Sequence, residues 1–85
     1  MKIDKFMQLI KSGFDVSFNY KDVFYTISVI REIKDNKQFG IGSDNGFKAD
    51  FDSFDSIPSF LLDDKSIADI IVSLKEDEIY YWLFI

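Results

Sequence analysis

The chain has 85 residues, of which 10 are basic and 15 acidic, so its net charge is −5. That length suits one small domain, and a hydrophobic content of 47% with 18% aromatic residues is typical of a globular chain and argues against disorder. Because Cys and His are absent, there is no disulfide framework, thiol nucleophile, imidazole base or histidine-based metal centre. We therefore expect a single domain over residues 1–85 that is not an enzyme and holds no cofactor or metal.

Helical spacing marks the first predicted element. Ile3, Phe6, Met7 and Ile10 fall on one face of a helix over residues 3–12, and Gly13 can take the left-handed conformation that ends it.

From Phe14 the apolar period changes to two. Residues 14–20 alternate apolar and polar side chains, and a turn at Lys21-Asp22 leads into a second strand over residues 23–31. A polar segment separates this strand from a third one over residues 37–43. We expect these three strands to be neighbours in an antiparallel sheet.

Glycines punctuate the third strand. Gly40 and Gly42 lie on the face opposite its apolar residues, which indicates a bulge or a close approach by another element. Together with Gly46 they resemble a broken nucleotide-binding fingerprint, but its third glycine position holds Asn45 and the segment lies between two strands. Phosphate binding is therefore not expected.

Asn45-Gly46 predicts a two-residue hairpin turn with positive φ angles at both residues. The turn leads to a fourth strand containing Phe47, Ala49 and Phe51, which completes a four-stranded antiparallel meander.

Helical patterns return after Phe51. A short helix carrying residues 57, 60, 61 and 62 is predicted, with Ser53 or Ser56 as its cap, and a clearer amphipathic helix over residues 67–75 is capped by Ser66. The apolar run 79–85 predicts a buried strand that joins the sheet or a strand that meets another protein, with continued helix as the alternative. The expected fold class is α+β.

The acids near residue 50 invite a calcium interpretation. A calcium loop that starts at Asp50 needs Gly at its sixth position and Glu at its twelfth, but these positions hold Asp55 and Leu61. We interpret Asp50, Asp52 and Asp55 as strand-end and helix-cap residues and expect no metal site.

Charge is unevenly distributed along the chain. Residues 1–38 carry seven basic and five acidic side chains, whereas residues 39–85 carry three basic and ten acidic ones. This balance disfavours direct binding to nucleic acid or an anionic membrane and favours a basic protein partner. The residues predicted to bind that partner are Asp50, Asp52, Asp55, Asp63, Asp64, Asp69, Glu76, Asp77 and Glu78.

Two further features bear on location and assembly. No apolar run approaches the ~18 residues that a membrane span needs, so a cytoplasmic protein without membrane contact is expected. Tyr80, Tyr81 and Trp82 are either core residues or an interaction hot spot. We expect a monomer or a weak dimer.

In size, acidity and order of elements the chain resembles the small acidic immunity proteins encoded beside bacterial toxins, as in contact-dependent growth inhibition and polymorphic toxin systems. It also resembles short bacterial and phage proteins with a pattern such as FNYKDVFYTIS over residues 18–28 followed by FDSFD over residues 51–55. The resemblance implies a non-catalytic inhibitor of a nuclease-type toxin. Two alternatives stay open: a phage-encoded inhibitor of a bacterial defence nuclease that mimics nucleic acid, and an assembly protein that self-associates through residues 80–85.

Overall fold

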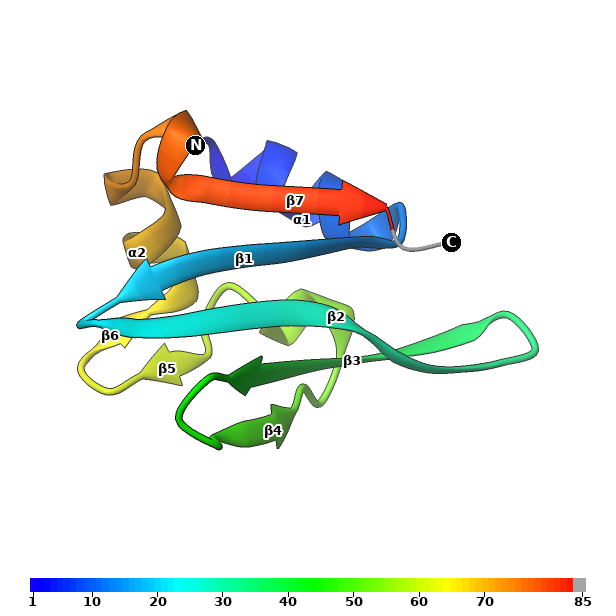
Figure 1. Ribbon diagram of the computed structural model, residues 1–85. Coiled ribbons are helices and arrows are strands. Elements are labelled where there is room, and N and C mark those ends of the chain that lie inside the picture. Colours follow the sequence, from blue (N-terminus) through cyan, green and yellow to red (C-terminus); the bar gives the residue numbers. More distant parts are fainter. Residues whose placement is uncertain (84–85) are drawn as a thin grey trace.

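A computed structural model describes residues 1–83 and has two helices packed against a five-stranded antiparallel sheet (Figure 1). The strand order in the sheet is β4-β3-β2-β1-β7, and β5 and β6 form a separate small hairpin. The predicted α+β class is confirmed. The elements are α1 (Ile3–Lys11), β1 (Phe14–Tyr20), β2 (Val23–Ile33), β3 (Asn36–Ser43), β4 (Lys48–Asp50), η1 (Phe54–Ser56), β5 (Leu61–Leu62), β6 (Lys65–Ser66), α2 (Ile67–Ser73), η2 (Glu76–Glu78) and β7 (Ile79–Leu83).

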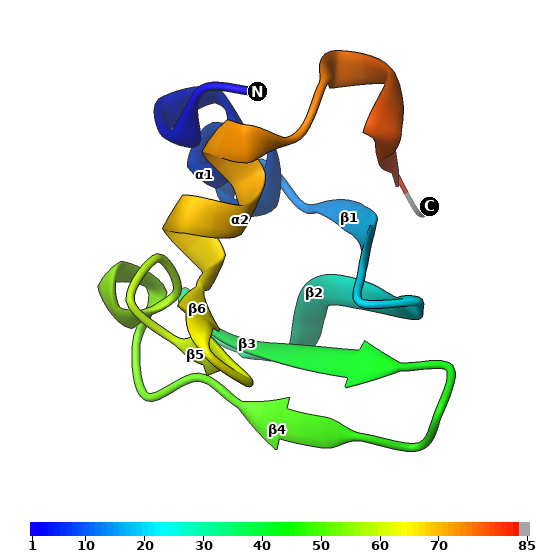
Figure 2. The same cartoon turned by 90° about the vertical axis from the view of Figure 1, so that its left-hand side faces the viewer.

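The core lies between one face of the sheet and the two helices. Figure 2 shows α1, α2 and the β5–β6 hairpin on the same side of the sheet, and no helix formed by residues 1–83 covers the other face. Phe6 and Ile10 of α1 are fully buried, as their helical spacing predicts. They meet Val16 and Phe18 of β1, which are also fully buried because alternate residues of a strand point to one face.

The β1–β2 hairpin closes in two residues. Lys21 and Asp22 have φ angles of 50° and 64°, the left-handed conformation that two-residue hairpins with matching twist require. The predicted turn at these residues is confirmed, and it uses side chains that take this conformation less readily than Asn or Gly.

Gly40 allows β2 to bulge. The β2–β3 register shifts between Val29 and Arg31, and the Ile30 side chain crosses the backbone of Gly40. A Cβ atom added to Gly40 would lie 3.0 Å from Cγ2 of Ile30 and 3.2 Å from the Ala49 carbonyl oxygen. The predicted close approach at this glycine is confirmed.

The loop from β3 to β4 differs from the prediction. Only Gly46 has a positive φ, 93°, and the Ser43 amide donates to the Phe47 carbonyl oxygen at 2.9 Å across a loop of residues 44–46. The expected two-residue turn at Asn45-Gly46 is therefore wrong by one residue. A glycine is also favoured after a type I turn in a three-residue loop, so the local sequence does not distinguish a two-residue loop from a three-residue loop.

The helix predicted to carry residues 57, 60, 61 and 62 is wrong. The chain instead forms the short η1 and then the β5–β6 hairpin, in which Leu62 is 2% exposed and Leu61 is 63% exposed. Strand geometry points neighbouring side chains in opposite directions, whereas the predicted helix would have put both leucines near one apolar face. Hydrogen bonds from Ile67 to Phe60 and from Ala68 to Pro58 fix this segment to the start of α2.

The amphipathic second helix is confirmed but ends two residues early. The Ser66 hydroxyl accepts from the Asp69 amide at 3.2 Å, which is the predicted cap. Leu74 is extended, and the amino-terminal ammonium of Met1 donates to its carbonyl oxygen at 2.8 Å. This positive group lies at the carboxyl end of α2, where the helix dipole favours a cation.

The last strand joins the sheet at an edge. β7 pairs antiparallel with β1 from Phe14 opposite Leu83 to Phe18 opposite Ile79, which confirms the predicted strand over the helix alternative. Only Ile79 of this strand is buried, so the expectation of a buried strand is wrong. An edge strand has no neighbour on one side, and residues 84 and 85 of the predicted strand lie outside the described residues.

Candidate functional site

All nine acidic residues that were predicted to bind a partner have exposed side chains, but they do not form one compact patch. One group runs from the last residue of β4 into η1, one lies around the β5–β6 turn and the start of α2, and one forms η2 immediately before β7. Since β4 and β7 are opposite edges of the sheet, the first and third groups are separated by its full width. The groups are Asp50, Asp52 and Asp55; Asp63, Asp64 and Asp69; and Glu76, Asp77 and Glu78.

Three of the nine carboxylates are paired with lysines within the chain. Lys21 lies 2.9 Å from Asp63 and 3.0 Å from Asp64, and Lys5 lies 3.3 Å from Glu76. Within residues 1–83 the other six have no basic partner at ion-pair distance. Most of the negative charge is therefore exposed and not neutralised.

The middle group is partly engaged in holding the fold together. The Tyr20 hydroxyl donates to Asp64 at 2.6 Å, and the Lys21 ammonium donates to Asp63 at 2.9 Å. Hydrogen bonds from Tyr20 and Lys21 lower the pKa of Asp64 to about 2. The hydrogen bond between Tyr20 and Asp64 also raises the pKa of the Tyr20 hydroxyl. These contacts join the β1–β2 turn to the β5–β6 turn, so Asp63 and Asp64 have a structural role that the sequence pattern did not indicate.

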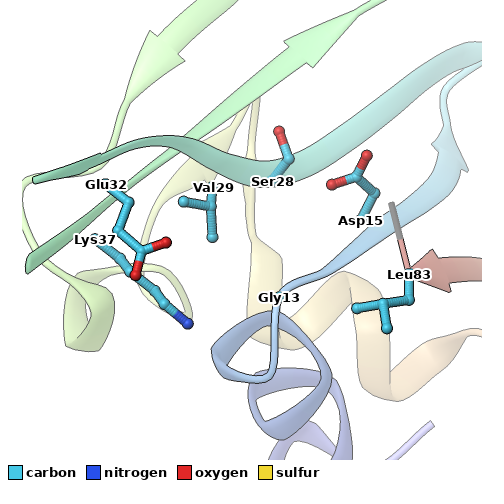
Figure 3. A pocket seen from close by; sticks show the side chains of 7 residues that line it. All are labelled: Gly13, Asp15, Ser28, Val29, Glu32, Lys37 and Leu83. Carbon is cyan, nitrogen blue, oxygen red and sulfur yellow. The ribbon is translucent and has the colours of Figure 1, made fainter. Parts of the chain in front are cut away.

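A cleft of about 370 Å³ opens where β1 and β2 diverge (Figure 3). Pairing of the two strands stops at Val16 opposite Ile27, and β2 continues beyond it as part of a projecting hairpin arm with β3 (Figure 1). Asp15 points from β1 toward Ser28 on β2, and partial burial raises the pKa of its carboxyl. The cleft is lined by Gly13, Asp15, Ser28, Val29, Glu32, Lys37 and Leu83.

The cleft offers limited chemistry. Glu32 and Lys37 are partners across the β2–β3 register, and the Lys37 ammonium donates to the carbonyl oxygen of Lys11 at the end of α1 at 3.3 Å. Among residues 1–83, no three Asp or Glu side chains come together in a way that could hold a metal ion. In the sequence, Asp15 is marked only as a polar position in an alternating strand, which is no signal of function.

The sheet face away from the helices combines a polar centre with aromatic side chains near one edge. At the centre, the hydroxyls of Ser17 and Thr26 lie 2.7 Å apart, and Ser17 is fully buried. On the same face, the rings of Phe24 and Tyr80 are 6.3 Å apart, and Trp82 lies opposite Asp15 in the β1–β7 register.

The three carboxyl-terminal aromatics are largely outside the core. Tyr80 is 50% exposed, and Tyr81 and Trp82 are each 41% exposed. Core packing as their main role is therefore wrong, and the interaction interpretation stays a prediction.

No protein-family model, curated protein or solved structure matches the chain. Neither helix in the described part of the chain has the length and apolar character needed to cross a membrane. Function is therefore inferred from charge, exposure and topology.

Proposed function

We propose that the protein is a non-catalytic inhibitor that binds a basic protein partner, in the manner of an immunity protein that neutralises a nuclease-type toxin. The observation that carries this proposal is the exposure of nine carboxylates, six of which have no basic partner among the described residues. Uncompensated surface charge of one sign accelerates association with a partner of opposite sign and fixes the orientation of the complex. A nuclease presents such a surface because lysines and arginines contact its phosphate substrate.

The two outer acidic groups are expected to contribute most of the binding. Asp52, Asp55 and Asp77 make no hydrogen bond or ion pair through their side chains within residues 1–83, so binding a cation costs them no internal contact. Asp63 and Asp64 already contact Lys21, which weakens their attraction to an external cation. They are expected to contribute less.

The experiment is co-expression with the protein encoded by the adjacent gene, followed by affinity measurement at low and high salt. If that protein is the toxin, the chain is expected to restore growth and to form a one-to-one complex whose affinity falls as salt rises. Asp52→Lys with Asp55→Lys is expected to weaken binding at least about 10-fold at low salt, and Asp77→Lys alone is expected to weaken it less.

A matched control comes from the basic half of the chain. Asp35→Lys reverses one charge at an exposed turn between β2 and β3 and belongs to none of the three acidic groups. Its affinity is expected to stay within about twofold of the wild type. Unchanged affinity at low salt in both the Asp52→Lys, Asp55→Lys variant and the Asp77→Lys variant would show that the acidic groups do not bind the partner.

A further inference from the structure

The two edges of the sheet are protected to different degrees. β4 has only three residues, and it carries Lys48 and Asp50 at its ends, with Asp50 accepting a hydrogen bond from Gln38. Short length and charge are the usual means by which an edge strand avoids pairing with another chain. β7 has five residues, none of them charged, and within residues 1–83 no strand lies beyond it (Figure 1).

The unprotected edge also exposes apolar side chains. Residues 80–83 of β7 are 41–50% exposed, and all four are aromatic or branched. Since a buried aromatic side chain covers about 150–250 Å², these four residues expose roughly 350–400 Å² of side-chain surface per molecule. Backbone amides and carbonyls along the free side of β7 add hydrogen-bonding groups that have no strand partner in the described part of the chain.

We propose that β7 pairs antiparallel with β7 of a second copy of this chain, around a two-fold axis at Tyr81. In this register Tyr80 faces Trp82 of the other copy, Ile79 faces Leu83, and Tyr81 faces its own equivalent. An antiparallel pair is symmetric about such an axis, so one strand is complementary to itself without any change in sequence. The two sheets become one sheet of ten strands.

Because the β4 edge is protected, pairing through β7 gives a closed dimer and does not continue into a fibre. Pairing through β7 leaves β4 at both ends of the joined sheet, so no free β7 edge remains and the assembly closes at two copies.

Electrostatic repulsion does not prevent this pairing. Each copy carries a net charge of −5, but the acidic η2 residues precede β7 and therefore lie at opposite ends of an antiparallel pair. Six residues of strand separate the two η2 ends by about 20 Å, which exceeds the screening length of about 8 Å at physiological salt. Added salt reduces the remaining repulsion, so it strengthens this dimer, whereas it weakens binding to a basic partner.

The exposed area predicts a weak dimer. Complete burial of these side chains in both copies would cover at most roughly 700–800 Å², which is below the approximately 1,200 Å² at which stable interfaces begin. We therefore expect a monomer at about 10 µM and a growing dimer fraction toward about 1 mM.

The test uses the purified full chain in sedimentation equilibrium and in an NMR dilution series. The mass is expected to rise from 9.9 kDa toward twice that value with concentration, and more steeply at high salt. Backbone shifts that change on dilution are expected along β7 and not along β4. A wild-type chain that stays monomeric at about 1 mM overturns the proposal, as do dilution shifts confined to another surface.

Charge variants at the two-fold axis identify the strand pairing. Tyr81→Lys and Tyr81→Glu each place two like charges opposite one another, so each is expected to weaken self-association at least about 10-fold, and mixing them is expected to restore it. Leu61→Lys, at an apolar position on β5 that is 63% exposed, is the control that keeps the dimer. Self-association that persists in both single variants overturns pairing through β7. None of these measurements needs the basic partner, so failure of the proposed inhibitor function leaves this test intact.

Discussion

Replacement of Ile71 in α2 tests how the helices are packed on the sheet. Ile71 is 0% exposed and belongs to the apolar core, whereas the next residue of the same helix, Val72, is 57% exposed. Ile71→Ala removes three carbons, which costs about 2.4 kcal/mol at about 0.8 kcal/mol per buried CH₂ group, and the remaining cavity adds to this. The expected loss in the free energy of unfolding is about 3–4 kcal/mol, against less than about 0.5 kcal/mol for Val72→Ala.

Urea unfolding followed by the fluorescence of Trp82, the single tryptophan, measures both values. A chain of 85 residues has a total stability of about 4–13 kcal/mol, so the Ile71 variant is expected to lose a large share of it. Equal losses in the two variants would mean that α2 does not present Ile71 to the core, and would refute the packing of α2 on the sheet through this residue.

The hydrogen bond between Ser17 and Thr26 predicts unequal effects of removing either hydroxyl. Thr26→Val leaves the buried Ser17 hydroxyl without a partner, so it is expected to lower the free energy of unfolding in urea by about 1–3 kcal/mol, more than Ser17→Ala does. Equal costs would show that water reaches Ser17. Acid titration of stability tests Asp64, because its pKa of about 2 in the fold, below the ordinary 3.8, contributes stability that is present above pH 3.8 and lost as the pH falls toward 2. Asp64→Asn is therefore expected to flatten the loss of stability over that range, and an unchanged slope would contradict the contact with Tyr20. Asp15 affects stability in the opposite direction to Asp64, because its raised pKa means that the fold disfavours the charged carboxylate. Asp15→Asn is expected to raise stability at pH 7 and to match the wild type below pH 3.8, whereas a less stable variant at pH 7 would show that the carboxylate has a favourable partner.

Some helices and strands could be predicted closely from the sequence, because the residues that form and end them are neighbours in the chain. α1 and the first three strands appear within two residues of their expected bounds, because each has a regular apolar period and a nearby glycine or polar turn to end it. The cap of α2 at Ser66 could be predicted for the same reason: a serine followed by an apolar helical repeat is itself a local signal.

Tertiary contacts decided the form of residues 57–62 and of the β3–β4 loop. Ile57 and Leu62 are buried, as their apolar character requires, but this burial is reached through hydrogen bonds to the start of α2 without a helix of their own. Apolar character predicts burial, whereas it does not distinguish a short strand from a helix when the apolar run is brief.

The candidate site depended still more on tertiary structure. The sequence determined the net charge, the acidic character of the second half and the absence of imidazole and thiol chemistry, since these follow from composition alone. Only the fold separated the nine acids into three groups, engaged Asp63 and Asp64 with Lys21, and left β7 at an open edge. Strand order is set by contacts between residues far apart in the chain, such as Phe14 with Leu83, and no local pattern encodes which strand will have no neighbour.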